Sequence, residues 1–122
     1  MTRKEFQDVV SAALEELPPE FQDALHNLDI QVRWAPTPEE RRRSRLRAGH
    51  DLFGIYLGIP ITRRGSHYGM VVPDVIVIYQ RSHERATATR EQMIEQARQT
   101  LLHEIGHYMG IDEDRLRELG VG

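Results

Sequence analysis

Residues 101–113 are Leu-Leu-His-Glu-Ile-Gly-His-Tyr-Met-Gly-Ile-Asp-Glu, and this stretch decides how the fold of the chain is interpreted. Its first part closes the last long element, a helix predicted over about Arg90–Met109. Thr89 and Gln92 form a capping-box pair at the start of that helix. Gly110 is placed to end the helix in the left-handed conformation. The other predicted elements are arranged around this helix.

The two histidines of this stretch lie on the polar face of the predicted helix. At about 100° per residue, one side carries Ile94, Ala97, Leu101, Ile105 and Tyr108, and the other carries Gln92, Gln96, Gln99, His103 and His107. Side chains four residues apart meet on one face, so both imidazoles can hold one metal ion. Glu104 lies about 100° around the helix from His103. It is poorly placed as a third ligand but can reach a water on the metal.

A third ligand is expected shortly after the helix, because a catalytic zinc site uses three protein ligands and keeps one position open. Gly110 lets the chain turn back, and the next carboxylates belong to Asp112, Glu113 and Asp114. Glu113 has the spacing from His103 of the last ligand in the extended pattern H-E-x-x-H-x-x-G-x-x-H. We favour Glu113, and Asp112 and Asp114 remain rivals.

These residues predict a hydrolase that uses a metal-bound water. Zinc brings the pKa of its water toward about 7 and polarises the scissile carbonyl, while Glu104 accepts the proton as general base. We therefore expect a zinc-dependent metallopeptidase that acts on a peptide or protein substrate. Two histidines and a carboxylate favour Zn²⁺, with iron, cobalt and nickel as alternatives.

Apolar spacing predicts helices at both ends of the chain. Phe6–Leu17 repeats at three- and four-residue spacing and stops at Pro18, and a short helix follows around Phe21. Glu113–Leu119 predicts a last short helix. No repeat or low-complexity tract interrupts the 122 residues, so we expect one domain over residues 1–122.

Three segments between these helices predict strands. Alternating apolar residues over Leu28–Trp34 predict the first strand. The run Leu52–Ile59 predicts the second, with a close backbone approach at Gly54 or Gly58. The β-branched run within Val71–Gln80 predicts the third, and the proline at its entry favours an edge position. The layout is α+β, with about three strands in a mixed sheet packed with helices and the motif helix near the C-terminus.

Composition excludes several classes of protein. The chain has no cysteine, so disulfides, thiolate metal sites and cysteine nucleophiles are excluded. A net charge of −3 argues against a general nucleic-acid binder. No segment approaches the roughly 20 apolar residues of a membrane span, and the N-terminus lacks the apolar run of a signal peptide. We expect a cytoplasmic protein, without prediction of its oligomeric state.

Other polar or extended segments have two interpretations each. The charged stretch Glu39–Arg47 predicts a solvated loop or frayed helical turn, with contact to RNA or an acidic partner as the alternative. His67 and Tyr68 predict a loop tip, with closure over the site as the alternative. His83 is expected at the surface. The strand Val75–Tyr79 is either a plain edge strand or the edge to which a peptide substrate adds.

The stretch HEIGHYMGIDE resembles the zincin metallopeptidase signature in its metzincin-like extended form. Over nearly its full length the chain is similar to short bacterial proteins described as minimal zincin-like metallopeptidases with a matrix-metalloprotease-like domain. The similarity includes L-x-G-I-Y-x-G at Leu52–Gly58 and P-D-x-I-x-I-Y-Q at Pro73–Gln80. It implies zinc on the two histidines, Glu104 as base, an acidic third ligand at Glu113 and a minimal α+β core.

The chain departs from the metzincin pattern in two ways. Asp114–Gly122 contains no methionine that could form the methionine turn below the metal. We also expect no C-terminal subdomain of the kind that usually forms the far wall of the cleft. A shallow site of this kind suits short peptides or one particular partner.

Two other classes of function compete with a peptidase. A metal-dependent endoribonuclease in RNA maturation uses three histidines and a basic groove, typically with glycine after the first histidine. Glu104 and Glu113 therefore favour the peptidase. A non-catalytic metal-binding or interaction protein with a zincin core needs no base, and structural zinc sites usually close with four protein ligands.

Overall fold

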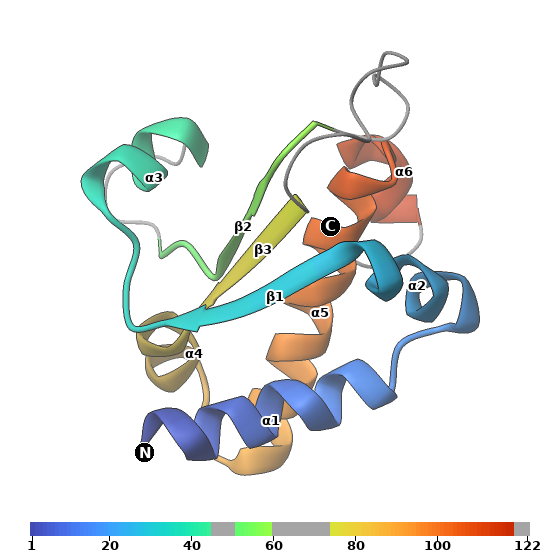
Figure 1. Cartoon of the computed structure of the whole chain (residues 1–122). Helices are drawn as coiled ribbons and strands as arrows, with labels where there is room; N and C mark the ends of the chain where they lie inside the picture. The colour runs from blue at the N-terminus through green and yellow to red at the C-terminus, as the bar shows by residue number, and fades with distance from the viewer. Residues whose placement is uncertain (45–50, 60–73, 119–122) are drawn as a thin grey trace.

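The computed structural model describes residues 1–44, 51–59 and 74–118 (Figure 1). These residues form α1 (Arg3–Glu15), α2 (Pro19–Ala24), the 3-10 turn η1 (Leu25–Asn27), β1 (Leu28–Arg33), α3 (Pro38–Ser44), β2 (Gly54–Leu57), β3 (Asp74–Tyr79), α4 (Gln80–Ala86), α5 (Arg90–Tyr108) and α6 (Glu113–Glu118). The α+β prediction is confirmed, with the motif helix near the C-terminus. The assignment of residues 1–122 to one domain stays a prediction.

The sheet has the strand order β1-β3-β2 in the described residues. β1 pairs with β3 in parallel, with Leu28 opposite Asp74, and β2 pairs with β3 antiparallel, with Gly54 opposite Ile78. The sheet is therefore mixed, as predicted, but the prediction of an edge position for the third strand is wrong. The proline behind that prediction precedes Asp74 in the sequence, and the described residues of β3, Asp74–Tyr79, contain no proline, so they can pair on both sides.

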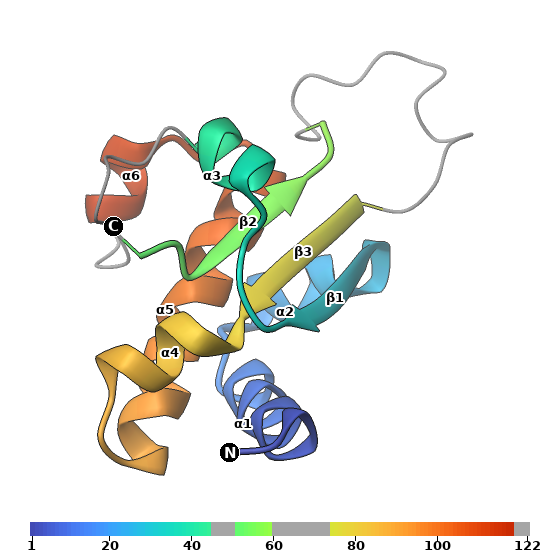
Figure 2. The same cartoon turned by 90° about the vertical axis from the view of Figure 1, so that its left-hand side faces the viewer.

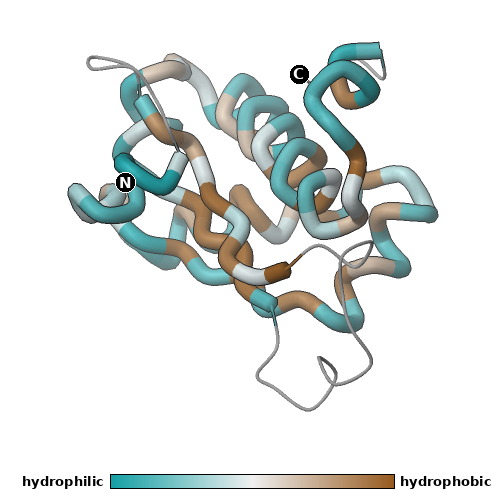
Figure 3. The backbone as a smooth tube through the Cα atoms, turned by 90° about the horizontal axis from the view of Figure 1, so that it is seen from above, coloured by the Kyte–Doolittle hydropathy of each residue, from teal (hydrophilic) through white to brown (hydrophobic). Residues whose placement is uncertain are grey.

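The main core lies between the sheet, α1 and α5. Its fully buried side chains include Phe6, Val9, Ala13, Ile76, Ile78, Ala97, Leu101 and Ile105. Figures 1 and 2 show α5 running behind the sheet with α1 across its first half. In Figure 3 the hydrophobic stretches gather in the middle of the molecule and the hydrophilic ones follow the outer helices. The apolar face predicted for the first helix is thus the one that packs on the motif helix. No helix of the described part is both long and apolar enough to cross a membrane.

Gly54 lets β2 lie directly against α5. A Cβ at this position would lie 2.8 Å from Thr100 Cγ2 and 2.9 Å from the carbonyl oxygen of Val77. The close approach predicted at this glycine is confirmed, and it brings the strand next to the helix that carries the histidines.

Of the two alternatives for the charged stretch from Glu39, the helical turn is nearer to the structure than the solvated loop. The stretch forms the helix α3 as far as Ser44, and its residues beyond Ser44 lie outside the described part. Thr37 Oγ1 accepts from the Glu40 backbone N–H and Glu40 Oε1 accepts from the Thr37 N–H, both at 3.1 Å, which forms a capping box. Glu40 is buried and also accepts from Tyr79 Oη at 2.7 Å and Arg33 at 2.9 Å. Burial alone would raise the pKa of Glu40, but these hydrogen bonds and the Arg33 charge lower it. The charged Glu40 therefore connects α3 to the sheet through Tyr79 of β3 and Arg33 of β1.

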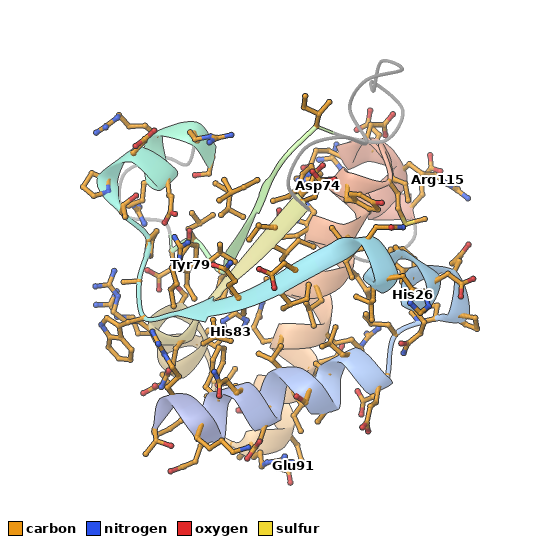
Figure 4. All side chains as sticks on the ribbon, viewed as in Figure 1. His26, Asp74, Tyr79, His83, Glu91 and Arg115 are labelled. Atoms are coloured by element: carbon orange, nitrogen blue, oxygen red, sulfur yellow. The ribbon has the colours of Figure 1, made fainter. Side chains whose placement is uncertain are left out.

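His83 is fully buried, so its expected surface position is wrong. Figure 4 shows it in the interior, between the sheet and α1. Its Nδ1 donates to the carbonyl of Tyr79 at 2.7 Å, which leaves Nε2 as the acceptor facing Thr100 Oγ1 at 3.1 Å. The rings of Phe6 and Phe53 lie 5.3 and 5.2 Å from it. Burial lowers the pKa of His83 to about 4, so the ring is neutral.

Stability should decrease in mild acid because of this buried ring. The unfolded chain protonates His83 near its ordinary pKa of 6.5, whereas the folded protein resists until about 4. The neutral ring therefore contributes fully above pH 6.5, and its contribution falls by up to about 3 kcal/mol as the pH drops toward 4. Urea unfolding at several pH values measures this slope.

The control is His83→Gln, which cannot titrate. It should be less stable at neutral pH and should lack the part of the slope that belongs to His83. Equal slopes for both proteins between pH 7 and 5 would show that His83 does not carry the effect.

Candidate metal centre

α5 holds His103 and His107 side by side on one face. The helix begins with the predicted capping box between Thr89 and Gln92, and Gly110 follows it with a φ of 80°, so both predicted ends are confirmed. Both histidines are half-buried, and their ring centroids lie 4.4 Å apart. The spacing of four residues therefore places the two imidazoles next to each other, as predicted.

Glu113 meets both histidines from α6. Its Oε1 lies 3.0 Å from His103 Nε2 and 2.7 Å from His107 Nε2. One ligand atom from each of the three residues fits within 4.8 Å of the others. The structure therefore brings together the three residues that the sequence indicated as metal ligands.

The rival carboxylates have other partners. Asp112 Oδ1 accepts from the Arg115 backbone N–H at 2.8 Å and so caps the start of α6. Asp114 is exposed and pairs with Arg117 one turn on. Of the three neighbouring carboxylates, Glu113 is the one that faces the histidines.

α6 reaches this position because Gly106 has no side chain. Leu116 is fully buried, and a Cβ on Gly106 would lie 2.6 Å from Leu116 Cδ2. The backbone N–H of Ile111 donates to the Gly106 carbonyl at 2.9 Å, which tightens the turn between the helices. Neither Gly106 nor Leu116 was singled out in the sequence, although Gly106 lies inside the motif.

Glu104 lies on the opposite edge of the imidazole rings from Glu113. It is 6% exposed, with Oε2 at 3.1 Å from His103 Nδ1 and Oε1 at 3.3 Å from His107 Nδ1. A carboxylate that accepts from Nδ1–H leaves Nε2 free to bind a metal, an arrangement common around zinc-bound histidines. Glu104 thus orients both Nε2 atoms toward Glu113.

The imidazoles of His103 and His107 lie between the carboxylates of Glu104 and Glu113. The hydrogen bond to Glu104 is the main reason that the pKa of His103 rises to about 9, and it also raises the pKa of His107. Burial by itself raises the pKa of Glu104, but the hydrogen bonds with both histidines lower it overall. Both carboxylates are therefore charged at neutral pH, and metal binding must displace protons from the histidines.

The donor set suits a divalent metal. Two imidazoles and one carboxylate are ligands typical of catalytic zinc. The Nε2–Oε1 distances of 3.0 and 2.7 Å are hydrogen-bond distances. Ligand atoms around a tetrahedral zinc ion lie about 3.4 Å apart, so the exposed Glu113 side chain would have to move outward by a few tenths of an ångström.

An open cavity of about 560 Å³ lies beside this cluster. Its lining includes residues 51–56 and one face of α5, with His103, Glu104, His107 and Glu113 at one part of it. Arg43 and Ser44 of α3 line it as well. Sequence reasoning did not assign α3 to the site, because its position depends on the buried contact of Glu40 with Tyr79. His67 and Tyr68, expected as a loop tip or lid, lie outside the described residues.

Comparisons with known proteins relate the chain to one family. The profile of the family described as zincin-like metallopeptidase matches residues 25–122. Among solved structures, a conserved hypothetical protein from T. thermophilus matches with a TM-score of 0.56 and 21% identity, over 98% of this chain and 97% of that one. At this identity the likeness concerns the fold. No curated protein matches the chain. The narrower resemblance to proteins with a matrix-metalloprotease-like domain stays a prediction.

Replacing Glu113 tests the third position of the cluster. Glu113→Gln should weaken zinc affinity at least tenfold, because a neutral amide replaces the charged oxygen that faces both histidines. Competition with a chromophoric chelator measures the affinity. Asp114→Asn is the matched control, since it removes a neighbouring charge that faces solvent; equal losses in both variants would contradict the assignment.

Gly106→Ala tests how α6 is positioned. The added methyl group should push Leu116 and its helix outward and lower zinc affinity by moving Glu113, with little change in far-UV circular dichroism. Leu116→Val in the same chain shortens the side chain that clashes, so it should restore part of the affinity. Unchanged zinc affinity in Gly106→Ala would show that this packing does not position Glu113.

Proposed function

Because the chain belongs to the zincin-like metallopeptidase family, we propose that it is a zinc-dependent peptidase. His103, His107 and Glu113 would be the metal ligands, and Glu104 the general base. The observation that carries the proposal is the convergence of both Nε2 atoms on Glu113 beside a buried carboxylate and an open cavity. A zinc ion bound there would supply a Lewis acid and an acidified water.

Glu104 has the charge and the access that a general base needs. Its pKa is lowered, so it is ionised and can take up a proton at neutral pH. It lines the cavity, although both of its oxygens now face the Nδ1 atoms of the histidines. Catalysis would require its side chain to turn one oxygen toward the cavity, while the other continues to orient a histidine.

The edge strand β2 is the proposed binding site for the peptide backbone. The sequence suggests the segment Val75–Tyr79 for this role, but β3 is central and pairs with strands on both sides. β2 pairs only with β3 among the described residues, and Gly54, Ile55 and Tyr56 line the cavity. An extended peptide that paired with β2 would lie along the cavity beside the histidines.

The two alternative functions have different requirements at the site. An endoribonuclease would not need Glu104, whereas a structural metal site would not need a cavity beside a three-ligand set. A cytoplasmic location and a peptide or protein partner stay predictions.

Glu104→Gln tests the proposed base. The variant should still bind about one zinc per chain, because the amide oxygen can accept from one imidazole Nδ1–H, but hydrolysis of a fluorogenic peptide library should fall by at least 10²-fold. Elemental analysis and initial rates measure the two properties. Glu84→Gln, on α4 and outside the cavity lining, is the control. Retained hydrolysis in Glu104→Gln would remove Glu104 as the base.

A further inference from the structure

The side of the cavity formed by α3 carries a cation. Arg43 is the only lysine or arginine among the described residues that line the cavity. The residues of the metal cluster come from α5 and α6, and α3 is a separate element that contributes Arg43 and Ser44 to the cavity lining (Figure 1). Part of the cavity wall is thus supplied by α3.

α3 presents Arg43 in a defined direction because Glu40 fixes the helix. Glu40 is buried and holds Tyr79, Arg33 and the Thr37 backbone. Arg43 follows Glu40 by three residues, which places it about 60° around the helix from this anchor. Arg42 falls about 160° away on the other side, is exposed, and does not line the cavity.

Arg43 is also the one cavity charge that no described residue neutralises. Glu104 and Glu113 lie against the two histidines, and Asp51 pairs with Arg85 at 3.4 Å. Arg43 is exposed, and its side chain makes no ion pair or hydrogen bond with the described part of the chain. An exposed guanidinium without such a partner can bind the carboxylate of a ligand with two parallel hydrogen bonds.

We propose that Arg43 selects substrates with a carboxylate, so that the site prefers acidic peptides. The proposal rests on the proposed peptidase function and names its substrate class. A peptide seated beside β2 would present this carboxylate to Arg43 while its scissile bond lies at the histidines. The carboxylate belongs either to an acidic side chain or to the C-terminus of the peptide.

Binding to the zinc-loaded Glu104→Gln protein separates recognition from cleavage. Fluorescein-labelled peptides that differ only in Glu, Gln or Lys, scanned along an otherwise neutral sequence, are titrated by fluorescence anisotropy. Each peptide is made as the C-terminal acid and as the amide, which distinguishes the two sources of the carboxylate. Arg43→Glu is compared with Arg42→Glu, because both change the net charge equally on the same helix.

The acidic peptide should bind about fivefold more tightly than its Gln counterpart, near the upper limit for an exposed charge pair. Arg43→Glu should reverse the preference in favour of Lys, and Arg42→Glu should leave it unchanged. Equal binding of Glu and Gln peptides, or equal effects of both variants, would overturn the role of Arg43 without touching the peptidase proposal.

Cleavage by the wild-type protein gives the complementary result. Arg43-dependent binding of acidic peptides without any cleavage would overturn the peptidase proposal and keep the recognition. If no peptide binds but single-stranded RNA does, with equal weakening by both variants, both proposals are overturned.

Discussion

The site depends on two close contacts with α5, each made possible by a glycine that has no side chain. At Gly54 the strand β2 lies against Thr100, and at Gly106 the side chain of Leu116 lies over the helix itself. The first contact sets the distance between the sheet edge and the histidines, and the second sets the position of Glu113. Because interiors are close-packed, a single methyl group at either glycine would change the separation of the groups that act together. The cavity is lined by β2 and α5, and the contact at Gly54 sets the distance between these two elements.

Electrostatics complement this packing. Two imidazoles lie between two carboxylates, and each carboxylate contacts a different edge of the rings. Glu104 is buried and orients the rings, whereas Glu113 is exposed and can move. A buried acid that orients the imidazoles and an exposed acid with room to adjust suit a site that has to accept an ion and also hold it. The same pairing of a buried and an exposed charge recurs in α3, where Glu40 is buried in a network and Arg43 lines the cavity.

Most features predicted correctly from the sequence depend on short-range geometry, and the close approach of Gly54 to Thr100 is an exception. The capping box at Thr89, the left-handed Gly110 and the shared face of His103 and His107 follow from helix periodicity alone. The errors concern residues whose environment is made by distant segments. His83 is buried because Phe6 and Phe53 enclose it, and β3 is central because β1, far away in the sequence, pairs with it. α3 is a helix in a stretch with almost no apolar residue because Tyr79 and Arg33 supply partners for Glu40. None of these partners is visible in the local pattern.

The residues of the metal cluster lie close together in the sequence, and this affects the order in which the parts of the chain can fold. His103, Glu104, His107 and Glu113 all come from one helix–turn–helix segment, so bringing them together closes only a short loop and costs little chain entropy. The parallel pairing of β1 with β3 instead joins Leu28 to Asp74 and requires a much larger loop. The ligand set can therefore form before the sheet is complete. A metal ion captured at that stage would stabilise the segment against which the remaining strands have to pack, and would act as a template for folding as well as for chemistry.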